Sequence, residues 1–150
     1  MDEILTREER TVLALRSLYA AMGYRPYKMG KFEEYDFYAE NRRFLERGNI
    51  AAFTDTTGRL MALKPDVTLS IAKGAAARSD TLKVYYDESV YRAPDPDAGF
   101  QEITQTGLEC IGTVDAYAMG EVLYLAAESL RAVSPRFVLD VAHMGYVAAL

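Results

Sequence analysis

Hydrophobic residues near the start of the chain recur at helical spacing, and polar residues fill the positions between them. The apolar positions are Val12, Leu15, Leu18, Tyr19 and Met22. Thr6 and Glu9, three residues apart, form a capping-box pattern just before this series, and Gly23 follows it as a C-terminal stop. The pattern therefore predicts a helix that starts after Thr6 and ends before Gly23.

The pattern changes several times before residue 80. Residues 24–29 predict a short extended piece, and residues 32–48 predict irregular chain that passes into helix. Residues 50–63 hold two short apolar runs around Thr-Thr-Gly, which is typical of a hairpin. Residues 64–77 begin with lysine, proline and an acid and then turn helical, so Asp66 is expected near the N-terminus of a helix.

The second half of the chain predicts strands on both sides of a long helix. Residues 81–93 and 100–112 are expected to form two strands joined by a loop. Residues 114–133 predict a helix capped by Thr113, and the apolar segment 136–144 predicts a further strand. A last helix is expected to begin after this strand.

This order of elements favours the α+β class, with an antiparallel sheet flanked by helices. Residues 1–150 are expected to form one domain, because that length can bury a sizeable core and no linker or repeat interrupts it. The apolar end at Leu150 suggests the N-terminal portion of a longer chain.

Composition narrows the range of functions. A net charge of −5 argues against nucleic acid as a partner, because phosphate binding needs a basic face. No apolar run reaches the ~18 residues of a membrane span, and no signal peptide is visible. Cys110 is the only cysteine and His143 the only histidine, so we expect neither disulfides nor a metal site, and a cytoplasmic location.

The candidate chemistry lies in residues 90–112, VYRAPDPDAGFQEITQTGLECIG. Strand alternation places Gln105, Gly107 and Glu109 on one face, and a paired strand could add Arg92 to that face. The glycine removes a side chain where a ligand could lie against the sheet. These groups could hold a zwitterion with an N–H in its side chain, but a solvent-facing sheet surface would show the same alternation.

Three segments resemble a known family. Residues 58–68, GRLMALKPDVT, are similar to the amino-acid-binding segment of histidyl-tRNA synthetases, and residues 90–112 to their motif 2. Residues 22–38, MGYRPYKMGKFEEYDFY, resemble motif 1 and the segment after it. The chain thus resembles the catalytic core of class II aminoacyl-tRNA synthetases of the histidyl type, and the resemblance implies that fold and a dimer.

The resemblance implies a histidine pocket. Asp66, where the family usually has glutamate, and Thr68 would meet the α-ammonium group, with Gln105 beside them. Arg92 would meet the carboxylate, and Glu109 would accept a hydrogen bond from the imidazole. These charges suit those partners.

The loop between the two strands departs from the family. A synthetase carries basic residues there to bind ATP, whereas this loop contains Asp95, Asp97 and Glu102 and no base. Residues 140–150 also resemble the histidyl-synthetase-like regulatory subunits of ATP phosphoribosyltransferase. That family implies a non-catalytic, allosteric role in histidine biosynthesis, with L-histidine as effector.

The resemblance to the regulatory family also implies partners, and two other functions remain open. A homodimer would assemble with the short-form catalytic ATP phosphoribosyltransferase subunit into a hetero-oligomer, without catalytic residues, cofactor, membrane or nucleic acid. The alternative is a fragment of a divergent histidyl-tRNA synthetase, an ATP-dependent tRNA ligase. A further possibility is a synthetase-like relative that binds another small molecule.

Overall fold

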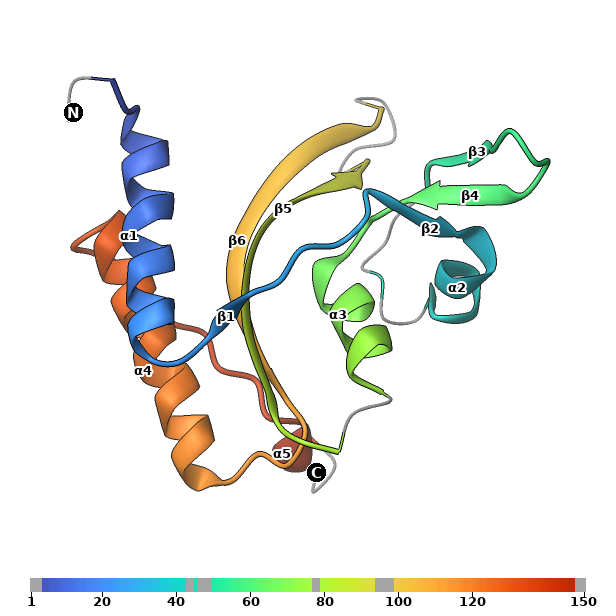
Figure 1. The fold of residues 1–150 in the computed structure, drawn as a ribbon. Coiled ribbons are helices and arrows are strands. Elements are labelled where there is room, and N and C mark those ends of the chain that lie inside the picture. Colours follow the sequence, from blue (N-terminus) through green and yellow to red (C-terminus); the bar gives the residue numbers. More distant parts are fainter. Residues whose placement is uncertain (1–3, 43–44, 46–49, 77–78, 94–98, 148–150) are drawn as a thin grey trace.

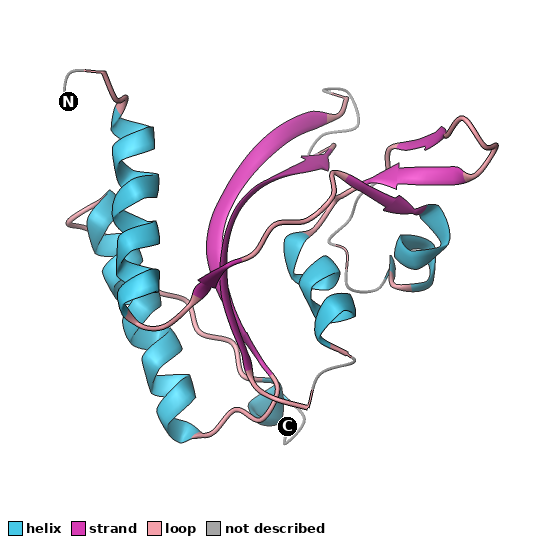
Figure 2. Ribbon diagram, viewed as in Figure 1, coloured by secondary structure: helices cyan, strands magenta, loops and turns pink. Residues whose placement is uncertain are grey.

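The computed structural model of the chain describes residues 4–42, 45, 50–76, 79–93 and 99–147. The strands are β1 (Arg25–Pro26), β2 (Phe32–Glu34), β3 (Ala52–Thr54), β4 (Leu60–Leu63), β5 (Leu82–Arg92) and β6 (Gln101–Ile111). The helices are α1 (Arg7–Ala21), α2 (Tyr35–Glu40), α3 (Val67–Ala75), α4 (Ala116–Val133) and α5 (Met144–Val147). Figure 2 shows these elements by type.

The centre of the fold is a long curved ribbon made by β5 and β6 (Figure 1). The two strands pair antiparallel over their full length, from Leu82 opposite Ile111 to Arg92 opposite Gln101. The parallel strand β1 adds a third strand beside β5. The two strands predicted from residues 81–93 and 100–112 are therefore confirmed.

Helices α1 and α4 cover one face of this ribbon. They lie side by side in Figure 1, and Tyr19 of α1 and Leu125 of α4 are almost completely buried between them and the sheet. Tyr85 and Leu108 of the ribbon pack against this cluster. No helix in the described part of the chain is long and apolar enough to cross a membrane.

Helix α3 covers the opposite face. Val67 and Ile71 of α3 pack against Val84 and Val90 of β5 in a second buried cluster, and Ile103 of β6 lies at its edge. Because successive side chains of a strand point to opposite faces, this is also the face that carries Gln105 and Glu109. The ribbon thus has a helix pair behind it and the predicted polar positions in front.

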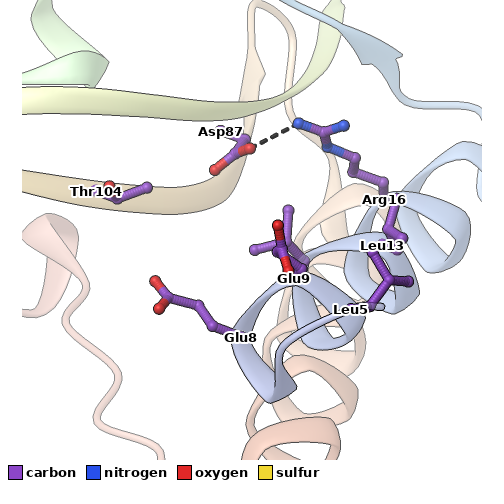
Figure 3. Close-up of a pocket in the computed structure, with 8 residues that line it drawn as sticks. Leu5, Glu8, Glu9, Leu13, Arg16, Asp87 and Thr104 are labelled. Atoms are coloured by element: carbon purple, nitrogen blue, oxygen red, sulfur yellow. Dashed lines mark hydrogen bonds and ion pairs between the residues drawn. The ribbon is translucent and has the colours of Figure 1, made fainter. Parts of the chain in front are cut away.

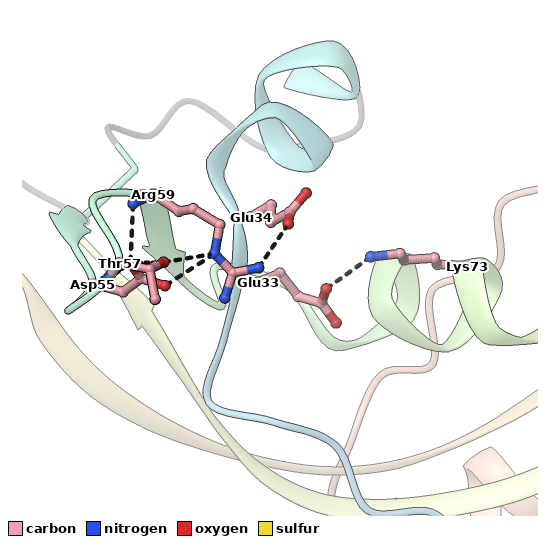
Figure 4. Close-up of polar contacts among 6 residues, drawn as sticks. All are labelled: Glu33, Glu34, Asp55, Thr57, Arg59 and Lys73. Carbon is pink, nitrogen blue, oxygen red and sulfur yellow. Dashed lines mark hydrogen bonds and ion pairs between the residues drawn. The ribbon is translucent and has the colours of Figure 1, made fainter.

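The second, smaller sheet has the order β2-β4-β3. Its hairpin turn is held by Asp55, whose carboxylate accepts hydrogen bonds from the backbone N–H groups of Thr57 and Arg59 and from the Arg59 Nε at 3.1 Å (Figure 4). Hydrogen bonds from Thr57 and Arg59 lower the pKa of Asp55 to about 2. Gly58 has φ of 85°, which this turn requires and which glycine adopts without strain.

Two salt bridges involve β2 of the smaller sheet. Arg59 contacts Glu34 of β2 at 3.4 Å, and Lys73 of α3 contacts Glu33 of β2 at 2.7 Å (Figure 4). These pairs are partly exposed, and each contributes little to stability by itself. Only the Lys73–Glu33 pair joins α3 to the small sheet, whereas the Arg59–Glu34 pair lies within that sheet.

The two sheets meet at Lys64, the residue after β4. Its backbone N–H donates to the Lys31 carbonyl, and its own carbonyl accepts from the Tyr91 N–H of β5. Its side chain is 1% exposed, and the Nζ atom contacts Glu88 Oε2 at 3.0 Å. The exposed side chain of Lys28 lies 3.5 Å from the other oxygen of Glu88. One buried lysine therefore connects the small sheet to the ribbon.

Both predicted caps near residue 6 and residue 66 are confirmed. The Thr6 hydroxyl accepts from the Glu9 N–H at 3.1 Å, and the Glu9 carboxylate accepts from the Thr6 N–H at 2.7 Å. Asp66 is the N-cap of α3 and accepts from the Leu69 N–H at 2.8 Å. The hairpin predicted within residues 50–63 is also present.

Two sequence predictions of local structure are wrong. The cap of α4 is Asp115, which accepts from the Ala118 N–H, whereas the Thr113 carbonyl accepts from the Thr81 hydroxyl. Asp115 is the better cap, since a carboxylate also interacts favourably with the helix dipole. Residues 32–34, expected to be irregular, form β2 because β4 supplies a pairing partner.

The strand predicted for residues 136–144 is absent. Val138 and Val141 are 82% and 61% exposed, and no strand in the described ranges pairs with this segment. A β-prone run becomes a strand only where a neighbour satisfies its backbone N–H and C=O groups. The helix expected after it begins at Met144 as α5.

Replacement of Lys64 by alanine is expected to destabilise the fold by about 3 kcal/mol, because it leaves the buried Glu88 carboxylate with only the solvent-exposed Lys28 ammonium as a partner. Urea denaturation followed by circular dichroism would measure the loss. The control is the double variant Lys64→Met/Glu88→Leu, which removes both charges and should recover most of the stability. Equal stability of Lys64→Ala and wild type would contradict the structural role of the pair.

Candidate functional site

All five residues predicted to bind histidine lie where α3 faces the ribbon. Asp66 and Thr68 are at the start of α3, Arg92 is at the end of β5, and Gln105 and Glu109 are on β6. Thr68 is exposed, whereas the others are half-buried, so the group opens to solvent on the α3 side. The structure brings residues from three elements to one face, and their role in binding stays a prediction.

Asp66 and Arg92 contact each other directly. The Arg92 Nη2 lies 3.3 Å from Asp66 Oδ2, and its Nε donates to the Pro65 carbonyl at 2.7 Å. The other carboxylate oxygen of Asp66, Oδ1, caps α3. The guanidinium of Arg92 is thus held in place by the segment that leads into α3, with one oxygen of Asp66 assigned to the helix and one to the arginine.

Thr68 and Glu109 form a second internal contact. The Thr68 hydroxyl donates to Glu109 Oε1 at 2.5 Å. Burial raises the pKa of the Glu109 carboxyl above its ordinary value, the hydrogen bond from Thr68 lowers it, and the negative charge of Asp66 raises it further. The interactions of Glu109 within the protein therefore stabilise its negative charge only in part.

Gln105 lies directly across the ribbon from Glu88. Within the part of the chain that the structure describes, its amide makes no hydrogen bond, so its donors and its acceptor remain available. Glu88 is engaged by Lys64 and Lys28 instead. Sequence reasoning missed this buried pair, although a lysine directly after the apolar run of β4 was a signal that could have indicated it.

The space above Gly107 is not empty. Gly107 pairs with Tyr86, and a Cβ atom on the glycine would lie 2.6 Å from the Tyr86 hydroxyl oxygen and 2.8 Å from the ring. The prediction that a ligand lies against the bare sheet there is therefore wrong. The cause is the cross-strand aromatic side chain, which folds over the glycine and fills the gap.

The acidic loop can be placed only in part. Asp95 and Asp97 belong to residues 94–98, which lie outside the described residues. Glu102, predicted to be a third acid of this loop, is in β6 instead. Its carboxylate accepts from the Tyr91 hydroxyl at 3.2 Å, and hydrogen bonds to Ser89 and Tyr91 lower the pKa of Glu102.

A groove of about 360 Å³ lies on the other face of the ribbon, beside the first half of α1 (Figure 3). Arg16 of α1 closes it at one end through a 2.6 Å contact with Asp87 of β5. Asp87 and Thr104 of its wall point away from the face that carries Gln105 and Glu109. The groove is thus separate from the predicted site.

The side chains that the structure describes give no indication of a metal site. Across the described ranges, no group of three or more His, Cys, Asp or Glu residues could hold a metal ion. The chemistry of the site is that of charged and hydrogen-bonding side chains: one guanidinium, two carboxylates, one amide and one hydroxyl. This set can bind a small zwitterion.

Comparisons with known proteins agree on one family. The family model described as histidyl-tRNA synthetase matches residues 2–150. An ATP phosphoribosyltransferase regulatory subunit from Thermoanaerobacter pseudethanolicus is 34% identical over 137 residues, which cover 87% of this chain and 35% of the relative. The chain spans about a third of the length of the curated relatives it matches.

Solved structures confirm the predicted fold class. A protein described as an ATP phosphoribosyltransferase regulatory subunit/histidyl-tRNA synthetase from Bacillus halodurans is 26% identical, with a TM-score of 0.69 over 82% of this chain and 33% of that chain. A histidine–tRNA ligase subunit from Alicyclobacillus acidocaldarius is 31% identical, with a TM-score of 0.68 over 84% of this chain and 37% of that chain. Both are similar to this chain as class II synthetase-like cores.

Replacement of Glu109 by glutamine is expected to stabilise the ligand-free protein at pH 7. The raised pKa means that the folded state resists ionisation of Glu109, so wild-type stability falls as pH rises through that pKa. The variant has no charge there and can still accept from Thr68. Thermal unfolding at pH 4 and pH 7 should show the gain at pH 7 and its disappearance at pH 4. A gain of equal size at both pH values would contradict the charge-based explanation.

Proposed function

The chain belongs to the histidyl-tRNA synthetase family, and from this membership we propose that it acts as a regulatory subunit of ATP phosphoribosyltransferase that binds L-histidine. The curated relatives bear the name of that subunit at 33% to 34% identity. Because the chain spans about a third of their length, the proposal concerns the protein that contains this core.

The observation that carries the proposal is the Asp66–Arg92 contact beside the Thr68–Glu109 contact. A free amino acid has one positive and one negative charge on neighbouring groups. Its carboxylate can replace Asp66 at Arg92, and its ammonium group can then take Asp66 as partner. A zwitterion thus exchanges one internal ion pair for two intermolecular pairs without leaving a charge unpaired.

The other two predicted residues suit a histidine side chain. Glu109 is half-buried with a raised pKa, so an N–H donor near it would relieve the cost of its charge. An imidazole supplies such a donor. Gln105 lies on the same face of β6 as Glu109, four residues before it. Its amide can donate to a carboxylate or accept from an ammonium group.

ATP activation fits the sequence less well. Asp95 and Asp97 occupy the loop where a synthetase needs basic residues for the triphosphate, so we propose a non-catalytic role. The competing function is that of a divergent histidyl-tRNA synthetase. It is favoured by one specific observation, the 31% identity to the histidine–tRNA ligase subunit.

The proposal includes the partners of the regulatory family. A homodimer would bind the short-form catalytic ATP phosphoribosyltransferase subunit in the cytoplasm and convey inhibition by histidine. Linkage then requires that histidine and the catalytic subunit change each other's affinity by the same factor.

Calorimetric titration of the full-length protein should show histidine binding that Glu109→Ala weakens by about 1–3 kcal/mol, or roughly fivefold to 150-fold. The matched control is Glu102→Ala, which removes the same side chain from the same strand but from its other face. Mg-ATP should not bind. Binding of Mg-ATP with histidine-dependent release of pyrophosphate would identify a synthetase instead.

Asp66 allows a further control in the same titration. Asparagine is as good an N-cap as aspartate, so Asp66→Asn keeps α3 capped while removing the charge that faces Arg92. Loss of histidine binding in Asp66→Asn with unchanged thermal stability would separate the role in binding from the role in the helix.

Co-expression with a short-form catalytic ATP phosphoribosyltransferase tests the partner. We expect the two chains to elute together in size-exclusion chromatography, and we expect histidine to inhibit the complex. Glu109→Ala should still form the complex but should require at least about fivefold more histidine for half-inhibition. Separate elution of the two wild-type chains would contradict the proposed assembly.

A further inference from the structure

The outward side of α4 carries exposed aromatic and aliphatic side chains. Tyr117 is 76% exposed, Tyr124 54% and Leu123 41%. Tyr117, Gly120 and Tyr124 are spaced by one helical turn each, so they lie on one side of the helix. Leu125, on the opposite side, is buried against α1 and the ribbon. Tyr117, Gly120, Leu123 and Tyr124 are called the α4 face below.

Charged side chains are kept off the α4 face. Glu121 is the only charged residue among residues 116–127. Its side chain is 7% exposed and lies 2.7 Å from the Nζ atom of Lys83 on β5. The next two charged residues along the helix, Glu128 and Arg131, pair with each other. The solvent side of a helix usually carries charged and polar residues, so this uncharged stretch indicates a surface for contact.

Gly120, in the middle of the α4 face, has no role in packing within the described residues. Glycine is less favourable than alanine in the interior of a helix. Gly120 lies inside α4 without a positive φ, and a Cβ atom on it would meet nothing within 4 Å outside its own stretch of helix. The missing methyl group leaves a notch between Tyr117 and Tyr124. Such a notch lets a second backbone approach closely.

We propose that the α4 face binds the same face of a second copy of this chain, with the two α4 helices crossing antiparallel at Gly120. Around a twofold axis, groups near the axis meet their own copies. Like charges would oppose each other there, and the α4 face has none. Tyr117 of one copy would lie beside Tyr124 of the other, because the two residues are at similar distances on either side of Gly120.

A second copy suits this face better than a charged partner. A strongly basic or acidic segment would have to leave its own charge without a partner on the α4 face. Tyrosine is enriched in the buried centres of interfaces, and two tyrosines from each copy would supply such a centre. A contact between two single helices is smaller than a standard stable interface, so we expect a dissociation constant on the order of micromolar.

This contact names a surface for the homodimer of the proposed function and rests on that part of it. It does not rest on the histidine site, because α4 and α3 cover opposite faces of the ribbon (Figure 1). Histidine binding is therefore measured separately on the same variants.

Disulfide trapping in the full-length protein tests the crossing. Tyr117→Cys/Tyr124→Cys, made in a Cys110→Ser background, should give a disulfide-linked dimer after mild oxidation, because residue 117 of one copy would face residue 124 of the other. Within one chain the two cysteines are about 10 Å apart along the helix, too far to bridge. Each single variant is the matched control and should stay monomeric on a non-reducing gel. Equal trapping of the double and single variants, or no trapping of the double variant, would overturn the proposed crossing.

Charge at the same positions should prevent the association. Tyr117→Glu/Tyr124→Glu brings four carboxylates around the proposed axis, so we expect its mass in sedimentation to be half that of the wild type at concentrations well above micromolar. The control is Val133→Glu, which adds a carboxylate at an exposed position of α4 outside the α4 face and should keep the wild-type mass. Histidine binding should be the same in all three proteins.

Gly120→Ala separates association from stability. A methyl group fills the notch, so the dissociation constant of the dimer should rise at least about fivefold. In solutions too dilute for association, the same variant should unfold at a higher temperature than the wild type, because alanine favours the helix. A lower unfolding temperature with unchanged association would show that Gly120 serves packing within the chain and would overturn its role in the contact.

The outcomes distinguish this inference from the proposed function. Wild-type mass in Tyr117→Glu/Tyr124→Glu overturns the contact, whether or not the protein binds histidine. Loss of the catalytic subunit from that variant without a change in mass would assign the α4 face to the catalytic subunit and overturn the second copy. Halved mass in that variant, with a wild type that fails to bind histidine, would support the contact and overturn the histidine site.

Discussion

The buried ion pair between Lys64 and Glu88 is the interaction on which the arrangement of this fold depends. Lys64 follows the small sheet, and both of its backbone groups and its side chain bind to neighbours, two of them in β5. The next residues, Pro65 and Asp66, lead into α3 and contact Arg92. A lysine with a buried ammonium group needs a carboxylate partner, so this position cannot shift along the ribbon without leaving a charge unpaired. The pair thereby sets where α3 meets the ribbon.

The same principle of internal compensation governs the site. Arg92 has Asp66, and Glu109 has the Thr68 hydroxyl, so few charges face solvent alone. A ligand must replace these contacts, and its net gain is the difference between new and old partners. Such a site favours ligands with matched charges over ions of one sign.

The sequence predicted what depends on neighbours along the chain. The Thr6 capping box, the Asp66 cap and the two strands of the ribbon follow from local spacing, and all are present. Contacts between distant segments were missed, because nothing in the pattern of β5 specifies that Tyr86 covers Gly107. The strand predicted for residues 136–144 failed for the same reason, since it has no partner among the described strands. The positions of the predicted site residues could be inferred, but their contacts with one another could not.

The two oxygens of Asp66 explain what is gained by having aspartate where the family usually has glutamate. One oxygen holds the backbone of α3, and the other faces the guanidinium of Arg92. Glutamate reaches one methylene further but is a poor helix cap, so it would exchange helix stability for reach. With aspartate, the carboxylate is anchored by the helix that it starts. The cap and the ion pair therefore place separate demands on this position, and a chain without the ion pair would still be expected to have Asp, Asn or Ser here.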